Sequence, residues 1–522
     1  MPTPLLSIIQ NMYEQDAYIL MDGCKTARVC PNRGVKQGCP LSPLLFSLYI
    51  NDIGDITEGC KGACTATEGV NVTHMLYADD SALFSHDPAE LQRMLNSLSV
   101  YAQRKHLIIY VQKSEVVCFN GQGNLPVFKL SGGELANKDT FKYLGMHFTK
   151  TVNLQEAAAR AAQPFLAAAY RVREFVRAHA LGDRPHTNLW LAKTYAVPAG
   201  MYASQVWGTP YMKHGAEFES VGQKCHLNFL KGILGIKRTT SNWAVLRECG
   251  HEALQFYWFR ATIKFLNSML TCNSNTVRKV VKADCALRTR DTSCWTAQLL
   301  EALQGLRNGE AYTQAVVEGR PIPMQEFVAD LRFRQQTVWR ALEGHDPRSQ
   351  PDKLTTYQAW FASPFVGNAR SAARVPRYLH LDLSKHVVRN ISRFRLRAHT
   401  LKVESGLWQG RNFVCNNCDC QDIQDEKHVL FFCKDVRVCG LQQKYAYLFN
   451  DLFATLQTFA EGDQPYLNMF HQASNQDVSD FLNQPNNKLF PFFLSLWMFL
   501  CWLAVTSKPM SQMTWLPVPP QL

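Results

Sequence analysis

Two neighbouring aspartates, Asp79 and Asp80, separate two short apolar runs in the sequence. The run before them, residues 70–76, alternates in polarity, and a second run, residues 81–85, follows at once. This pattern predicts a tight β-hairpin with the Asp pair at its tip. Adjacent carboxylates repel each other and are costly to desolvate. They lie either in a solvated turn, where Asp is common, or against a cation that compensates their charge.

The oxygen ligands of such a pair suit a hard divalent cation such as Mg²⁺, or Mn²⁺ in its place. Paired carboxylates that hold two metals roughly 4 Å apart catalyse nucleotidyl transfer. The choice between a solvated turn and a metal site therefore depends on the neighbouring motifs.

A glycine-bearing loop, residues 33–43, lies about forty residues upstream and leads into a helix-like run, residues 44–53. Glycines allow close backbone approach or unusual dihedral angles. Ser42 is placed to cap the helix, and Pro43 suits its first position. A loop of this kind can seat a phosphate or a base. The alternative is an ordinary loop followed by a capped helix.

Together these segments resemble the reverse transcriptases of non-LTR retrotransposons. Residues 33–43 resemble the segment that contacts template and incoming nucleotide, and residues 77–80 resemble the catalytic Tyr-x-Asp-Asp turn. Residues 107–119 resemble the next motif of the polymerase palm, although Tyr110 stands where the family usually has Asn. Residues 141–148 resemble the primer-grip hairpin. The four motifs follow the family's order within about the first 150 residues.

The resemblance implies an α+β fold: a partial palm of antiparallel sheet and helices, followed by a mostly helical thumb and C-terminal region. It also implies an RNA-directed DNA polymerase, with an RNA template, a DNA primer or target and dNTP as partners. Asp79 would bridge two metals and Asp80 would support them. Lys113 would protonate or stabilise the leaving pyrophosphate; without the family it reads equally well as a surface lysine. The implied nucleotide and nucleic-acid contacts are Arg33, Gly34, Gln37, Gly38, Ser42, Pro43, Tyr77, Tyr143, Leu144 and Gly145.

One part of the family pattern is absent. The family places a strand with another catalytic aspartate upstream of the loop, whereas residues 4–13 resemble the helix after that strand. Asp22, Asp52 and Asp55 stand in no matching context. Because two-metal catalysis needs several carboxylates, we expect weak metal binding by the Asp pair and an inactive chain in isolation. The alternative function is a non-catalytic, nucleic-acid-binding relic, with a membrane-tethered form as a third hypothesis.

A cysteine and histidine cluster near the other end has the spacing C-x2-C-x9-H-x4-C, formed by Cys415, Cys418, His428 and Cys433. Three thiolates and an imidazole suit a closed, tetrahedral, structural zinc site. His428 and Cys433 are about one helical turn apart, so one helix face can supply both. Cys420 can replace Cys418, and the alternative is a set of buried free cysteines. The spacing also resembles the zinc module downstream of this family's polymerase, which implies either a grip on template or a stabilising role.

Length and charge agree with a polymerase of several domains. The chain has 522 residues, enough for two to four domains, and its net charge of +12 suits a polyanionic partner but also occurs without one. Seventeen cysteines and no leader-like N-terminus indicate a reducing compartment, the nucleus or the cytoplasm. We expect a partial palm over residues 1–150, a helical thumb-like region over 151–270, a helical connector over 271–400, a zinc module over 401–445 and a C-terminal tail over 446–522.

The segment after the palm motifs reads as helical. Patterning predicts a helix over residues 154–180 that is broken at Pro164, another that runs from residue 189 toward 208, and a third over 218–234 that stops at Gly235. The resemblance to the family's thumb extends to about residue 270. Four cations either face the backbone of the template–primer or form solvated helix faces; they are Lys224, Lys231, Lys237 and Arg238.

The C-terminal tail contains an uncharged apolar segment, residues 489–505. Its 17 residues are at the lower limit for crossing a bilayer. A membrane helix, a buried terminal helix and the frame-altered end of a decayed element remain open. The proline-rich end, residues 517–520, predicts disorder. The sequence indicates no oligomeric state.

Overall fold

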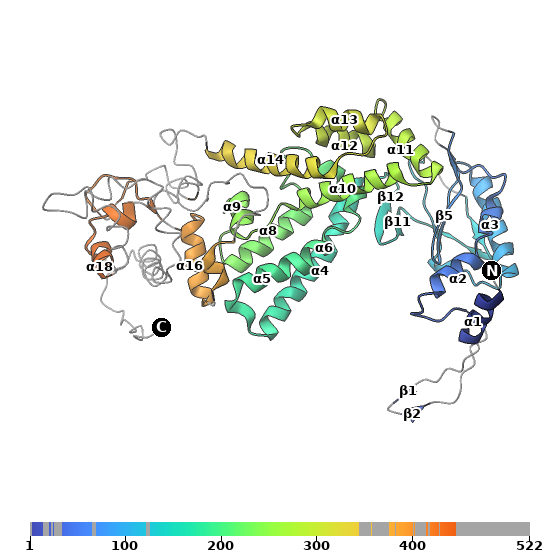
Figure 1. Ribbon diagram of the computed structural model, residues 1–522, viewed down its shortest axis with the longest axis horizontal. Coiled ribbons are helices and arrows are strands. Elements are labelled where there is room, and N and C mark those ends of the chain that lie inside the picture. Colours follow the sequence, from blue (N-terminus) through green and yellow to red (C-terminus); the bar gives the residue numbers. More distant parts are fainter. Residues whose placement is uncertain are drawn as a thin grey trace. The chain divides into compact units, whose positions relative to one another are not determined.

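The computed structural model describes residues 3–13, 20–21, 24–25, 34–64, 69–121, 126–343, 357, 375–381, 383–399, 401, 414–415, 418–426 and 428–444 (Figure 1). The predictions made for Arg33, Asp22 and the tail over residues 446–522 lie outside these residues. None of the helices in the described part of the chain combines the length and apolar character of a membrane span.

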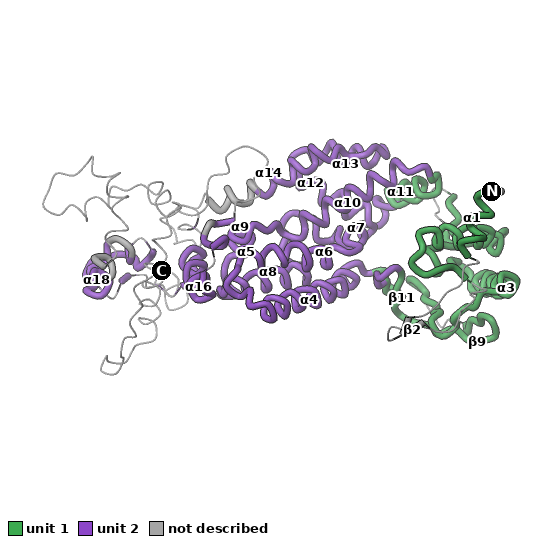
Figure 2. The backbone as a smooth tube through the Cα atoms, turned by 60° about the horizontal axis from the view of Figure 1, so that its bottom comes forward, with its two compact units in different colours: residues 1–143, 148–152, 274–286 green, residues 144–147, 153–273, 287–522 purple. Residues whose placement is uncertain are grey.

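The chain divides into two compact units (Figure 2). Unit 1 consists of Met1–Tyr143, Phe148–Val152 and Ser274–Ala286. Unit 2 consists of Leu144–His147, Asn153–Asn273 and Leu287–Leu522. Each unit is described by itself below.

Unit 1 mixes helices with short strand pairs. Its helices are α1 (Thr3–Tyr13), α2 (Ser42–Tyr49), η1 (Ile53–Thr57), α3 (Pro88–Arg104), η2 (Val111–Lys113) and most of α11 (Asn275–Leu287). Antiparallel pairs join β1 (Leu20–Met21) to β2 (Cys24–Lys25), β3 (Ala63–Cys64) to β4 (Asn71–Val72), β5 (His74–Tyr77) to β6 (Asp80–Leu83) and β8 (Lys129–Leu130) to β9 (Gly133–Glu134). A parallel pair joins β7 (Glu115–Val116) to β10 (Ala136–Asn137), and β11 (Thr140–Tyr143) pairs with β12 (Met146–Thr149).

Helix α3 organises the core of unit 1. It begins where the Asp87 side chain accepts a hydrogen bond from the Ala89 N–H and Pro88 takes the first position, as expected of a capped helix start. Two small apolar clusters pack on its buried face. One contains Leu95, Val116, Phe128, Leu130 and Leu135, and the other contains Ile53, Ile56 and Tyr101.

Unit 2 is helical in its described part, apart from Met146–His147 of β12 and an isolated β-bridge between Val414 and Ile423. Its elements are α4 (Leu154–Ala178), η3 (Leu181–Asp183), α5 (Pro185–Leu191), the π-helical η4 (Ala192–Ala196), α6 (Val197–Ala199), α7 (Ser204–Trp207), η5 (Thr209–Tyr211), α8 (Val221–Leu234), α9 (Asn242–Glu248), α10 (Leu254–Thr271), α12 (Trp295–Gln304), α13 (Gly309–Val317), α14 (Met324–Glu343), η6 (Arg377–His380), α16 (Lys385–Arg395), the π-helical η7 (His428–Phe432) and α18 (Val436–Lys444).

Tight packing holds the centre of unit 2 together. Phe165 of α4 is fully buried against a cluster that includes Ala192 and Ala196 of η4 and Phe229 of α8. Helix α8 ends as predicted at Gly235, whose φ of +65° is a left-handed conformation that glycine adopts readily. Burying a large aromatic side chain such as Phe165 stabilises a fold by roughly 1.5–3 kcal/mol.

Three predictions about these helices are wrong. Helix α4 runs unbroken through Pro164, because the cost of one lost backbone hydrogen bond is offset by the buried side chains on its flank, Phe165 first among them. The helix expected from residue 189 toward 208 begins earlier, at Pro185, continues through the π-helical η4 to Ala199, and is interrupted by a turn before α7. The helix after Pro43 ends at Tyr49 rather than near residue 53, and the 3-10 helix η1 follows. The mixed α and β character agrees with the predicted fold class.

Candidate metal and nucleic-acid sites

The Asp pair lies in the predicted hairpin. Strands β5 and β6 pair in a register that sets Tyr77 opposite Asp80, so Ala78 and Asp79 form a two-residue turn. Asp80 is therefore the first residue of β6 rather than part of the tip. Ala78 has a φ of +52°, in the left-handed region that alanine rarely adopts. Both aspartates and Tyr77 are exposed.

The carboxylates of Asp79 and Asp80 form no hydrogen bond or ion pair with any residue that the structure describes. The charge of Asp80 nevertheless acts on Tyr143 of β11. Burial, and after it the negative charge of Asp80, raise the pKa of Tyr143 above its ordinary value. The pair thus presents accessible, uncompensated oxygen ligands, which suit a divalent cation such as Mg²⁺.

The glycine-bearing loop is fastened to α1. Ser42 does not cap α2, because its hydroxyl donates to the Lys36 carbonyl oxygen (2.5 Å) instead of accepting a helix N–H bond. The Tyr13 hydroxyl lies 3.3 Å from that same hydroxyl. The Lys36 ammonium donates to the Met12 carbonyl oxygen and lies over the Tyr13 ring. Its charge is thus held close to α1.

The rest of this loop is open. Gly34 and Gly38 have φ values of +83° and +79°, and no atom of the described residues lies within 4 Å of where a Cβ would stand on either. Gln37 and Pro43 are exposed, and Pro43 occupies the first turn of α2 as predicted. The loop therefore leaves room for a ligand beside its backbone.

Two further polar residues of unit 1 have other contacts. The Lys113 ammonium lies 5.2 Å from the centre of the Tyr110 ring, and within the described residues no contact joins it to the Asp pair. Asp52 accepts hydrogen bonds from Lys105 (2.8 Å) and Tyr101 (2.7 Å), which lower its pKa. Asp52 therefore ties α3 to the end of α2, and its carboxylate is already engaged.

Leu144 and Gly145 form the turn between β11 and β12. Their φ values are +48° and +77°, the pattern of a two-residue hairpin turn with both central residues left-handed. Leu144 is partly exposed, and Tyr143 before it is half-buried.

The four cysteine and histidine residues of the predicted zinc site meet in unit 2. Ligand atoms of Cys415, Cys418, His428 and Cys433 all lie within 4.8 Å of one another. In a tetrahedral zinc site with bonds of about 2.3 Å, ligand atoms lie about 3.8 Å apart, so the spacing fits the metal. Cys418 is the second cysteine of this group, while the Cys420 thiol lies 3.8 Å from the Phe432 carbonyl oxygen.

A π-helical turn brings two of the ligands together. The Cys433 N–H donates to the His428 carbonyl oxygen (2.7 Å), a five-residue step rather than the α-helical step that we expected. The His428 Nε2 atom lies 3.3 Å from the Cys418 sulfur. Burial lowers the pKa of His428, although Asp422 and Asp425 oppose this. The neutral imidazole that results is the form that binds metal.

A buried carboxylate beside the cluster was not singled out by the sequence. Glu426 is fully buried and accepts a 2.6 Å hydrogen bond from the His399 Nε2 atom, with Arg397 at 3.7 Å. Burial alone would raise the pKa of Glu426, but His399 and Arg397 outweigh it and lower that pKa to about 2. The contact attaches the zinc cluster to the residues that follow α16.

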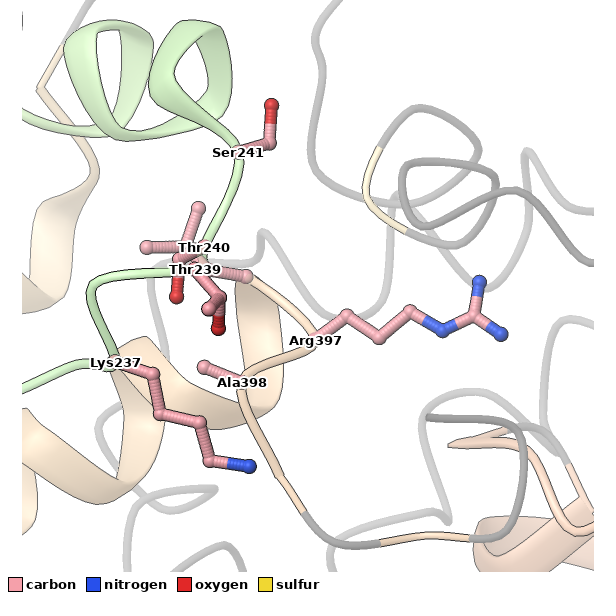
Figure 3. Close-up of a pocket in the computed structure, with 7 residues that line it drawn as sticks. Lys237, Thr239, Thr240, Ser241, Arg397 and Ala398 are labelled. Atoms are coloured by element: carbon pink, nitrogen blue, oxygen red, sulfur yellow. The ribbon is translucent and has the colours of Figure 1, made fainter. Parts of the chain in front are cut away.

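The four cations expected near the template–primer differ in their availability. Lys224 and Arg238 are exposed. Lys231 is buried, and its ammonium donates to the Arg238 carbonyl oxygen (2.6 Å) and to Asn242 (2.7 Å), so it does not face solvent as predicted. Lys237 donates to the His399 carbonyl oxygen (3.2 Å) and lines a small recess with Thr239, Thr240 and Ser241, from which the Arg397 side chain extends away (Figure 3).

Comparison with known proteins finds a family match for the N-terminal part of the chain. Residues 1–148, which contain the Asp pair and the loop, match the family described as reverse transcriptase (RNA-dependent DNA polymerase). That segment of the chain is a reverse transcriptase domain.

Its relatives are polymerases of mobile elements. The chain is 30% identical over 161 residues to the Pol polyprotein of the type-2 retrotransposable element R2DM of Drosophila melanogaster, covering 29% of this chain and 15% of the relative. It is 24% identical over 202 residues to the Pol polyprotein of the type-1 element R2 of Popillia japonica, covering 36% and 32%. It is 24% identical over 224 residues to the RNA-directed DNA polymerase of jockey from Drosophila melanogaster, covering 41% and 24%.

These relatives identify the reverse transcriptase domain as one of the non-LTR retrotransposon type. The matched segments span only 15–32% of the length of these three relatives.

Proposed function

We propose that the chain is a segment of an RNA-directed DNA polymerase that extends a primer 3′-hydroxyl on an RNA template by two-metal nucleotidyl transfer. One observation carries the proposal. An exposed Asp79–Asp80 pair without a compensating partner among the described residues lies within a segment of the reverse transcriptase family. An uncompensated pair of carboxylates is the arrangement that a divalent metal completes.

In this proposal Asp79 and Asp80 would hold the two Mg²⁺ ions, Asp79 as the main ligand and Asp80 in a supporting role. The bound ions would activate the primer 3′-hydroxyl and offset charge on the leaving pyrophosphate. Lys113 would protonate or stabilise the leaving pyrophosphate. The open loop with Gly34, Gln37, Gly38 and Pro43 would contact the template and the dNTP, and we assign Arg33, Ser42 and Tyr77 to the same site from the family resemblance.

The proposed organisation is a partial palm over residues 1–150, a thumb over 151–270, a connector over 271–400, a zinc module over 401–445 and a tail over 446–522. Tyr143, Leu144 and Gly145 form the primer grip. Cys415, Cys418, His428 and Cys433 bind one structural zinc ion, and Glu426 attaches that module to the chain after α16.

Additional polymerase segments complete the palm. Apolar side chains on α1 and α2 are exposed, among them Ile8 (57%) and Leu44 (59%). Exposed apolar patches of this kind mark interaction surfaces. Asp52 is not free to serve as a third carboxylate, because Tyr101 and Lys105 already engage it. We therefore expect the isolated chain to bind metal weakly and to be inactive alone.

The test is primer extension on an RNA template with Mg²⁺ and dNTP. The assay uses the chain alone and a form extended at its N-terminus by the corresponding upstream segment of a retrotransposon polymerase. We expect extension only in the longer form and a loss of about a thousand-fold in Asp79→Asn, since metal ions supply several kcal/mol of transition-state stabilisation.

Asp55→Asn is the matched control, because Asp55 is an exposed aspartate on η1 of the same unit. Extension that persists unchanged in Asp79→Asn would contradict the role of the turn. Salt-sensitive binding of template–primer without extension in either form would instead support the non-catalytic relic.

A further inference from the structure

We propose that Tyr202 is a positioning residue for the primer, because its side chain holds the Leu144–Gly145 turn in place. The inference rests on the proposed function, in which this turn is the primer grip. The Tyr202 hydroxyl donates to the Leu144 carbonyl oxygen. Its ring lies against Gly145, where a Cβ atom would stand 3.1 Å from the Tyr202 Cε1 atom.

The turn itself needs such support. Leucine rarely adopts the left-handed conformation that Leu144 has, with a φ of +48°. Leu144–His147 group with unit 2, whereas Tyr143 and Phe148–Val152, on either side in sequence, group with unit 1. Tyr202 belongs to unit 2 and supplies both of the contacts described above.

The backbone that carries Tyr202 is fixed to the core of unit 2. The Trp207 indole N–H donates to the Tyr202 carbonyl oxygen (2.8 Å), and the Trp258 indole N–H donates to the Gly200 carbonyl oxygen (3.1 Å). Both indoles are almost fully buried, and their ring centres are 5.0 Å apart. Tyr202 therefore extends from a rigid base, although 58% of its own surface is exposed.

Glycine at position 145 is part of the same arrangement. Its φ of +77° disfavours other residues, and a methyl group there would press on the Tyr202 ring. A side chain at position 145 would require the Tyr202 ring to shift by a few tenths of an ångström. Removing the Tyr202 hydroxyl alone should loosen the turn, and adding a methyl group at residue 145 should displace it.

The experiment compares the full chain with Tyr202→Phe and Gly145→Ala. The matched control is Tyr195→Phe, because Tyr195 of η4 is also 58% exposed and no contact between it and the turn is found in the described residues. Hydrogen exchange is followed in peptides that span residues 143–148. An RNA template annealed to a DNA primer with 2-aminopurine at its 3′ end reports whether the terminal base is held.

We expect exchange of the turn amides to be about five-fold faster in Tyr202→Phe, the effect of one typical hydrogen bond, and unchanged in Tyr195→Phe. We also expect brighter 2-aminopurine fluorescence in Tyr202→Phe and in Gly145→Ala at equal template–primer occupancy. Unchanged exchange in Tyr202→Phe would overturn the contact. Faster exchange with an unchanged primer signal would overturn the positioning role.

A different result would contradict the proposed polymerase function. If the unaltered chain leaves the primer terminus as free as in solution, that result contradicts both the polymerase function and the positioning role. The exchange comparison between Tyr202→Phe and Tyr195→Phe would still decide whether Tyr202 holds the turn.

Discussion

The two candidate metal sites differ in chemistry and in exposure. In unit 1, Asp79 and Asp80 offer hard oxygen ligands on an exposed turn and have no partner among the described residues. In unit 2, three thiols and an imidazole converge within 4.8 Å, and three of the four residues are buried. A closed set of four ligands is typical of structural zinc, whereas an open set leaves positions for substrate.

The two units that contain these sites also differ in how deeply their large side chains are buried. Unit 2 packs fully buried aromatic side chains such as Phe165 and Trp258 between its helices. Unit 1 has small apolar clusters and leaves Ile8, Leu44 and Leu48 exposed. Of the ten largest fully buried side chains among the described residues, only Met94 and Phe128 belong to unit 1, so packing contributes more to the helical unit. Four changes test this contrast.

The largest effect is expected at the closed site. Cys433→Ser should lose one equivalent of zinc and unfold the surrounding segment, because zinc binding contributes on the order of 10 kcal/mol to small zinc domains. Cys420→Ser should keep the metal, since its sulfur lies outside the four-ligand group. Zinc content after dialysis, measured by mass spectrometry, checks both. Retention of zinc by Cys433→Ser would mean that the ligand set is wrong.

The second largest effect is expected from core packing, because losing a large apolar side chain should destabilise unit 2 more than unit 1. Phe165→Ala is expected to destabilise unit 2 by about 4 kcal/mol, the usual cost of removing a buried phenylalanine. Leu44→Ala, at a side chain that is 59% exposed, should cost less than about 0.5 kcal/mol. Tryptophan fluorescence during urea unfolding reports the cost in unit 2, because unit 1 contains no tryptophan, and hydrogen exchange of peptides from residues 42–57 reports the cost in unit 1. Similar costs at the two positions would remove the contrast in packing.

Acid should weaken unit 2 through a buried histidine pair. The His226 Nε2 atom lies 3.1 Å from the His251 Nδ1 atom, and burial lowers the pKa of His251 to about 4. Below about pH 6.5 this histidine is protonated in the unfolded chain but not in the folded chain. The free energy of unfolding therefore has its full value above pH 6.5 and decreases toward pH 4. The loss approaches about 3 kcal/mol.

His251→Gln should reduce this pH dependence but not abolish it, because burial also lowers the pKa of His226; urea midpoints at pH 7 and pH 5 measure the change. Equal midpoints for the unaltered chain at the two pH values would show that the pair is not kept neutral by burial.

The smallest effect is expected at the turn that bears the Asp pair. Ala78→Gly should stabilise the hairpin by about 0.5 kcal/mol, because glycine adopts a φ of +52° without strain. Ala82→Gly, at a buried position of β6, should do the opposite. Hydrogen exchange of residues 74–83 measures both. Slower exchange in Ala82→Gly than in Ala78→Gly would contradict the left-handed geometry of the turn.

Local patterns predicted what depends on neighbours in sequence. Alternating polarity predicted the β5–β6 hairpin, and residue spacing predicted the cysteine and histidine cluster. A glycine predicted the end of α8. Predictions were wrong where distant residues decide the outcome. Ser42 bonds to Lys36 instead of capping α2, and packing carries α4 through Pro164.

The same reason explains the residues that sequence patterns did not reveal. Tyr202 and Leu144 are 58 positions apart, and Glu426 and His399 are 27 positions apart. No periodicity or spacing links such pairs. The π-helical step between His428 and Cys433 was also hidden, because a five-residue separation is compatible with several local conformations.

The most direct measurement is Mn²⁺ binding, followed by electron paramagnetic resonance, to the chain in its N-terminally extended form with template–primer and dNTP. We expect Asp79→Asn to abolish the Mn²⁺ binding of the unaltered protein, whereas Asp55→Asn should leave that binding unchanged. Equal Mn²⁺ binding by the unaltered chain and by Asp79→Asn would contradict the central claim that this exposed turn is the metal site of a reverse transcriptase.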